Sequence, residues 1–111
     1  MNVDYTDRAK QAGEHLQLLH QATGELKEIL GSAQDSVCAQ WDQVEDERGR
    51  SLYSLKLSDF SGEAETRFAP EDLRGGPHRT FRLARLCNEL LRIRTHKLME
   101  ALREPFVMEE N

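Results

Sequence analysis

A hydrophobic repeat with alternating steps of four and three residues runs from Tyr5 to Val37 and constrains the fold more than any other feature. Its positions are Tyr5, Ala9, Ala12, Leu16, Leu19, Thr23, Leu26, Leu30, Ala33 and Val37. Only Thr23 among them is polar, and the positions between them are mostly charged or amide residues. Such spacing places one apolar seam along a helix, as a coiled coil or a helix hairpin requires.

The ends of this helix are marked less clearly than its seam. Asp4 and Asp7 favour the positive end of a helix dipole, so the helix is expected to begin near residues 4–6. Gly31 is a candidate stop, but the seam continues beyond it. The sequence therefore predicts one long N-terminal helix that persists to about residue 34.

The hydrophobic period changes from helical to alternating in the middle of the chain. Asp46-Glu47-Arg48-Gly49 is a turn signal, with Gly49 suited to a positive φ, between Trp41–Glu45 and Ser51–Ser58. Tyr53, Leu55 and Leu57 share one face of the second strand. A further turn at residues 59–62 leads to the alternating segment 63–68. This pattern predicts a three-stranded antiparallel meander.

Residues 32–46 also permit a helical interpretation. Val37, Trp41 and Val44 are spaced by four and three residues, so the same segment could continue the first helix. That alternative leaves only a two-stranded hairpin, which is marginally stable in water. The sequence alone does not decide whether residues 35–46 form a strand or a helix.

The last third of the chain predicts a turn followed by a long helix. Pro70-Glu71-Asp72-Leu73 indicates a tight turn, and Pro77 suits the first position of a helix that runs to about Arg103, before Pro105. An apolar stripe on this helix is suited to covering a sheet. It comprises Leu83, Leu86, Cys87, Leu90, Leu91, Leu98, Ala101 and Leu102.

These elements predict an α+β fold in the order α-β-β-β-α: a long N-terminal helix, a three-stranded antiparallel meander and a C-terminal helix. With 111 residues the chain is long enough for one modest core. We expect a single domain over residues 1–104 and an acidic C-terminal tail over 105–111.

The lack of recognisable targeting signals and the use of cysteine indicate a reducing compartment. No stretch of about 18 apolar residues and no charged-then-apolar leader is present, so a cytoplasmic protein without a membrane span is expected. Cys38 and Cys87 are far apart in sequence and lack a C-x-x-C partner. They are therefore interpreted as free, packed thiols.

Charge is distributed unevenly along the chain despite a formal net charge of −5. Residues 1–48 hold ten acidic residues against four Lys and Arg, whereas residues 74–104 hold eight Lys and Arg against three acidic residues. Either the two regions neighbour and neutralise each other, or the basic helix meets an acidic partner or a nucleic acid.

No pattern of catalytic or metal-binding residues is found. The histidines at 15, 20, 78 and 96 lack metal-ligand spacing, and no phosphate-binding glycine loop is present. Cys38 has no flanking motif of a catalytic nucleophile. The sequence therefore predicts a protein that is not an enzyme and uses no cofactor or metal.

Arginines on the C-terminal helix are the one feature with a ligand chemistry. Arg79, Arg82, Arg85 and Arg92 are candidate contacts for phosphates of a nucleic acid or for an acidic partner. Glu89 and Glu100 interrupt this face, no aromatic residue is interleaved to stack bases, and the pI is near 5.4. Nucleic-acid binding is therefore not favoured.

The order of elements resembles the YbaB/EbfC family of small bacterial nucleoid-associated proteins. The likeness lies in the third strand that leads into Pro70-Glu71-Asp72-Leu73 and then into the helix that begins near Pro77. The resemblance implies strands that mediate dimerisation and helices that grip DNA, with Arg79, Arg82, Arg85 and Arg92 as phosphate contacts. The chain departs from that family in lacking its glycine-rich second strand.

The sequence predicts a small interaction or scaffold module that self-associates or docks on a protein partner through the first helix. Its association seam would be Leu16, Leu19, Leu26 and Leu30, most simply in a homodimer with coiled-coil packing. The alternative is a dimeric, nucleoid-associated type of DNA-binding protein. Whether the seam is intermolecular or packs within the monomer is not fixed by sequence.

Overall fold

The computed structural model describes the backbone of residues 1–109 and the side chains of residues 1–103. The strands are β1 (Asn2–Tyr5), β2 (Cys38–Glu45), β3 (Ser51–Asp59) and β4 (Gly62–Phe68). The helices are α1 (Asp7–Lys10), α2 (His15–Leu30) and α3 (Pro77–Glu109), with short 3₁₀ segments η1 (Gly31–Ser36) and η2 (Pro70–Leu73). The fold is α+β, as the sequence predicted.

The four strands form one mixed sheet in the order β1-β2-β3-β4. The β2–β3 and β3–β4 pairs are antiparallel, whereas β1 lies parallel to β2 with Val3 opposite Ala39. A parallel pair needs a crossover connection, and α1 and α2 provide it here. β1 and β4 are therefore the two edges of the sheet.

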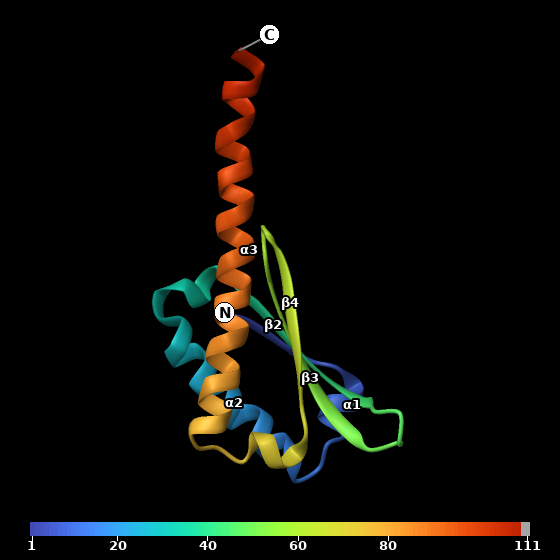
Figure 1. Cartoon of the computed structure of the whole chain (residues 1–111). Helices are drawn as coiled ribbons and strands as arrows, with labels where there is room; N and C mark the ends of the chain where they lie inside the picture. Colours follow the sequence, from blue (N-terminus) through green and yellow to red (C-terminus); the bar gives the residue numbers. More distant parts are fainter. Residues whose placement is uncertain (110–111) are drawn as a thin grey trace.

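Helices α2 and α3 lie against one face of this sheet (Figure 1). The strand residues that point to that face alternate along the chain, and Trp41, Leu55 and Phe68 among them are fully buried. Their partners in the core include Leu19 and Leu26 on α2 and Leu83 and Leu90 on α3. The residues at intervening positions of β2 and β4 are largely exposed or half-buried. The sheet thus has one covered and one open face.

The predicted long N-terminal helix is wrong, and so is the order α-β-β-β-α. Residues 2–5 form strand β1, α1 is a single turn, and the chain breaks at Gly13, whose φ is 64°. Only α2 retains the helical seam, and it ends at Leu30 because Gly31 adopts a φ of 55°. The seam spacing upstream of residue 13 arises from a strand and a turn instead.

The predicted three-stranded sheet is also incomplete, because β1 adds a fourth, parallel strand. Residues 38–45 form strand β2, so the helical alternative for residues 32–46 is wrong. Gly49 takes the positive φ of 77° expected of the first hairpin turn, and the Asp46 carboxylate accepts hydrogen bonds from the backbone N–H groups of Arg48 and Arg50. That turn fixes the register of β2 and β3.

Helix α3 is the longest element and extends well beyond the sheet (Figure 1). The molecule measures 59 × 30 × 23 Å as a result. α3 continues to Glu109, past the end predicted at Arg103, since a proline removes one N–H donor without preventing the following residues from bonding to the previous turn. Residues 110–111 and the side chains of the predicted acidic tail lie outside the described residues.

Candidate interaction surfaces

The predicted association seam on α2 is used inside the chain. Leu19 and Leu26 have no exposed surface, and Leu16 and Leu30 are half-buried where they pack against the same core. Their neighbours come from the covered face of the sheet and from α3. The four leucines therefore stabilise the monomer, and Leu19 and Leu26 are not accessible to a partner while it is folded.

Thr23, the one polar residue of the seam, is the acceptor of a buried hydrogen bond. The indole N–H of Trp41 donates to Thr23 Oγ1 at 2.8 Å, and Thr23 Oγ1 in turn donates to the carbonyl of Leu19 at 2.8 Å. Tyr5 Oη lies 3.3 Å from the same oxygen. Trp41 is thus a core residue that joins the sheet to α2, and it is not a surface contact.

Arg79 links the beginning of α3 to α2. Its guanidinium donates to both the Glu25 carboxylate, at 2.7 Å, and the carbonyl of Leu73, at 3.0 Å. Burial alone would raise the pKa of Glu25, but hydrogen bonds from Thr80 and Arg79 and the charge of Arg79 outweigh it, so the pKa lies below its ordinary value. This carboxylate stays ionised and holds Arg79 in place.

Arg82 links α3 to the end of β4. It donates to Asp72 Oδ2 at 3.0 Å, and it also bonds to the carbonyl of Arg67. Its guanidinium carbon lies 4.6 Å from the centre of the Phe68 ring, within range of a cation–π contact. The carbonyl of an edge strand is thereby satisfied from within the chain.

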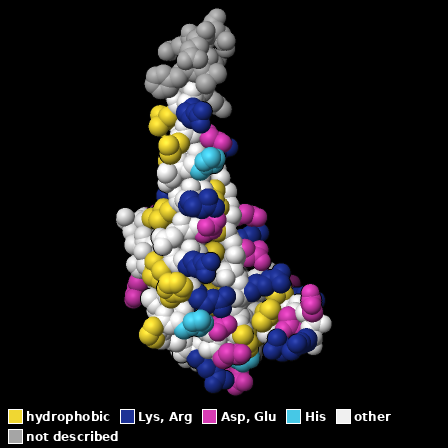
Figure 2. Space-filling model, viewed as in Figure 1, with side chains coloured by type: hydrophobic (Ala, Val, Ile, Leu, Met, Phe, Trp, Pro, Cys, Tyr) yellow, Lys and Arg dark blue, Asp and Glu magenta, His cyan; other side chains and the backbone are white. Residues whose placement is uncertain are grey.

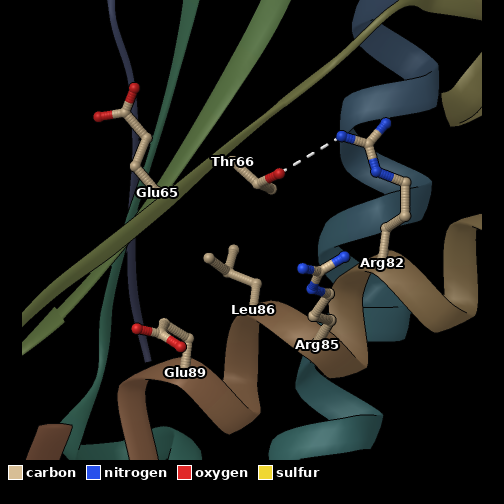
Figure 3. A pocket seen from close by; sticks show the side chains of 6 residues that line it. All are labelled: Glu65, Thr66, Arg82, Arg85, Leu86 and Glu89. Carbon is tan, nitrogen blue, oxygen red and sulfur yellow. Dashed lines mark hydrogen bonds between the residues drawn. The ribbon is translucent and has the colours of Figure 1, made fainter.

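A groove of about 410 Å³ lies between β4 and α3. Its lining residues are Glu65, Thr66, Arg82, Arg85, Leu86 and Glu89. Figure 3 shows Arg82 on the helix directed at Thr66 on the strand, whereas the side chain of Glu65 points away from the helix residues. Two carboxylates accompany the two guanidinium groups, so the groove has mixed charge and lacks the uniformly positive lining of a phosphate site.

Arg92 and Arg85 occupy the solvent side of α3. Arg92 donates to Glu89 at 2.6 Å, and this bond together with the Arg92 charge lowers the pKa of Glu89. Arg85 has no ion-pair partner among the described side chains. Of the four arginines predicted to contact phosphate, three are therefore paired with carboxylates of the same chain.

A fifth arginine anchors the middle of α3 to the β3–β4 turn. Arg94 donates to Asp59 Oδ2 at 2.7 Å, and the Asp59 side chain has no exposed surface. Burial would raise the pKa of Asp59, but hydrogen bonds from Ser61 and Arg94 and the positive charge of Arg94 lower it overall. Beyond this point the helix leaves the body of the protein.

The strongest candidate surface lies on the solvent side of α3. Five of its large apolar side chains are exposed, namely Phe81 (66%), Leu91 (43%), Leu98 (49%), Met99 (59%) and Leu102 (68%). Figure 2 shows hydrophobic side chains along the projecting part of the helix, among basic and polar groups. The predicted stripe on α3 thus covers the sheet only through residues 83–90: Leu91 faces away from the sheet, and Leu98 and Leu102 come after the last contact with it among the described side chains, at Arg94. The sequence signal for this exposed surface was the length of the apolar stripe. The stripe is longer than the strands that it was expected to cover.

Nucleophilic and metal-binding groups do not assemble into a site in the described part of the chain. Cys87 is buried, and burial raises the pKa of its thiol to about 11, so it stays protonated at neutral pH. Cys38 is exposed on the open face of the sheet. Among the residues with described side chains, no three His, Cys, Asp or Glu residues gather closely enough to hold a metal ion.

No family model, curated protein or solved structure matches this chain. The resemblance to the YbaB/EbfC family therefore stays a prediction. None of the described helices is both long enough and apolar enough to span a bilayer.

Proposed function

We propose that this chain is a small interaction module that binds a protein surface through the exposed apolar residues of α3. We call this surface the α3 stripe and define it as Phe81, Leu91, Leu98, Met99 and Leu102. The observation that carries the proposal is that these residues stay exposed on a helix whose far half has left its own core. Contiguous apolar surface on a soluble domain commonly marks an interaction site.

The α3 stripe replaces the α2 seam as the proposed contact because it is accessible. The core of the monomer is complete without it, since the sheet already packs on residues 83–90 of α3. A projecting helix of this kind is marginally stable on its own, and packing of its apolar face against another surface would stabilise it. Binding thus uses surface that folding leaves exposed.

Nucleic-acid binding, the alternative function, receives less support from the side-chain contacts. Arg79, Arg82 and Arg92 would each have to leave a carboxylate before they could contact phosphate. Arg79 and Arg82 also hold α3 against the rest of the fold, so their release would cost stability. Carboxylates of the same chain already neutralise these arginines, although only Glu25 among them belongs to the acidic region 1–48.

The proposal predicts that photo-crosslinking in an extract depends on the α3 stripe. Benzoylphenylalanine at position 102 lies on the stripe, whereas the same group at position 100 lies about 160° around the helix. We expect protein adducts from position 102 that are lost when Leu91→Glu is added, and few adducts from position 100. Gel shift and mass spectrometry measure the adducts and assign the cross-linked site.

Equal labelling from both positions would contradict a specific surface on α3. Loss of DNA retardation on Arg85→Glu, with adducts unaffected by Leu91→Glu, would instead favour the nucleic-acid alternative. Arg85 suits this test because it has no ion-pair partner among the described side chains, so its substitution leaves the internal pairs intact.

A further inference from the structure

Four of the five residues of the α3 stripe, all except Met99, lie within a heptad-like seam that also includes two polar positions. Steps of three and four residues connect its positions, which are Phe81, Ala84, Asn88, Leu91, Thr95, Leu98 and Leu102. All of them are exposed except Ala84, which is half-buried, and none belongs to the buried core. This is the spacing of a coiled-coil seam, and it is present on the side of α3 that faces away from its own sheet.

The residue types at these positions favour pairing with an identical helix. Leu91 and Leu98 occupy d positions, and Asn88 and Thr95 occupy a positions. Leucine at d with β-branched residues at a is typical of parallel two-stranded coiled coils, and a single Asn at a fixes register. An Asn88 side chain finds a matching donor and acceptor in Asn88 of a second copy only when the two helices are parallel and aligned.

Charges beside the seam favour the same orientation. In an antiparallel pair the e positions face each other, which would bring Arg92 of the two copies together. In a parallel pair the e positions face g positions, which are Cys87, Arg94 and Ala101. Arg94 is already neutralised by Asp59, so the parallel pair avoids an uncompensated repulsion.

The exposed apolar area is sufficient for a dimer. With about 200 Å² for a fully exposed large side chain, the five residues of the α3 stripe leave roughly 600 Å² open on each chain. Two copies would then cover about 1,200 Å² through these side chains alone, the lower end of the range for specific interfaces. The sheet does not lie between the two helices, because Leu83, Leu86 and Leu90 face it from the other side of α3.

We infer that the partner of the α3 stripe is a second copy of this chain, bound parallel and in register along α3 with Asn88 facing Asn88. The inference rests on the proposed function of the stripe and adds to it the identity and direction of the partner. The seam from Phe81 to Leu102 forms the interface, and the two sheets lie on opposite outer sides.

Sedimentation equilibrium of the purified chain tests the partner. We expect a reversible dimer, and Leu98→Glu should raise its dissociation constant by about 100-fold or more because it buries two like charges in one layer. Glu100→Gln, on the far side of the helix, should leave the dimer unchanged. Leu98 is exposed in the monomer and lies outside the core, so the fluorescence of the buried Trp41 should be the same in all three proteins.

Disulfide trapping tests the direction. In a Cys38→Ser background, Leu98→Cys places two thiols across a d layer in the parallel pair, whereas an antiparallel pair that brings the two Arg92 residues together separates them by roughly 18 Å along the axis. Glutathione buffer should link Leu98→Cys into a dimer and leave Glu100→Cys monomeric. Asn88→Val should tighten association but allow other registers, which would appear as species larger than a dimer.

The outcomes separate the two proposals. A chain that stays monomeric in pure form, while adducts from position 102 persist in extract, overturns self-pairing and leaves the α3 stripe as a site for another protein. A dimer that survives Leu98→Glu, or that is trapped equally well from position 100, also overturns the inference. A monomer without stripe-dependent adducts would contradict both proposals.

Discussion

Thr23 illustrates how one residue can join two elements. It is the single polar member of the seam, and its hydroxyl accepts from the Trp41 indole while it donates to the carbonyl of Leu19. No buried side-chain nitrogen or oxygen lacks a partner among the described residues. The hydroxyl therefore satisfies an N–H that would otherwise be buried without an acceptor.

We predict that Thr23→Val lowers the free energy of unfolding by about 1–3 kcal/mol, because the shape is kept while the indole N–H loses its acceptor. Thr23→Ser keeps the hydroxyl and removes one methyl group, so a loss of about 0.8 kcal/mol is expected. Denaturant unfolding followed by Trp41 fluorescence measures both variants. Equal losses in the two would show that packing, and not the hydrogen bond, is what matters here.

At the scale of elements, local signals predicted local structure well. The turn that ends at Gly49, the tight turn at Pro70 and the start of α3 at Pro77 all depend on residues within four positions of one another. The pairing of Arg79 with Glu25 and of Arg94 with Asp59 joins residues 54 and 35 positions apart. The unequal charge of the two halves suggested such pairs but could not identify the partners.

β1 was missed for the same physical reason. Its four residues pair with residues 38–41, so nothing nearby in the sequence indicates a strand. Tyr5 and Ala9 continued the seam spacing by coincidence, and Gly13, with its positive φ, was the one local sign of a break. The ten seam positions were all assigned to one helix, although they lie in several elements of the fold.

Two glycines allow a matched test of how an added Cβ changes stability in a helix and in a turn. Gly24 lies in α2, and a Cβ added there would meet no atom within 4 Å, so Gly24→Ala should raise the free energy of unfolding by about 0.5–1 kcal/mol. Gly62 has a φ of 151°, and an added Cβ would lie 3.1 Å from Ile93 Cγ2. Gly62→Ala should therefore destabilise the protein by more than Gly24→Ala stabilises it. Thermal unfolding measures both, and a neutral Gly62→Ala would contradict close packing between β4 and α3.

At the scale of the whole molecule, three arginine ion pairs connect the basic α3 to acidic groups elsewhere among the described side chains. Arg79, Arg82 and Arg94 are bound to Glu25, Asp72 and Asp59, respectively. They act at the beginning and the middle of the helix, and the projecting half carries no such tie to the body among the described side chains. The same charges that resemble a phosphate-binding face in the sequence thus attach α3 in the fold.

We predict that Asp59→Asn lowers the free energy of unfolding at pH 7 by about 1.5–3 kcal/mol, because the bond to Arg94 is charge-assisted. The pKa of Asp59 is lowered on folding, so its contribution is present above its unfolded pKa and is lost as pH falls through the folded pKa. The wild type should therefore lose stability as pH drops from about 5 towards 2, and the variant should lose less. Denaturant unfolding across this range measures the difference.

Glu63→Gln provides the control for that series. It removes one exposed carboxylate and shows how much a change in net charge alone contributes. Superimposable pH profiles for Asp59→Asn and the wild type would contradict a stabilising role for the Asp59–Arg94 pair.

The place of β1 in the sheet also sets the order in which the chain can fold during synthesis. β1 leaves the ribosome first, yet it has no partner strand until residues 38–45 have followed. The two hairpins can close as soon as they emerge, but the covered face of the sheet is completed only when α3, which follows the strands in the chain, has been made. A nascent chain thus carries an incompletely covered sheet until α3 has been synthesised, and a pause before Pro77 would be the moment at which chaperones find that face most exposed.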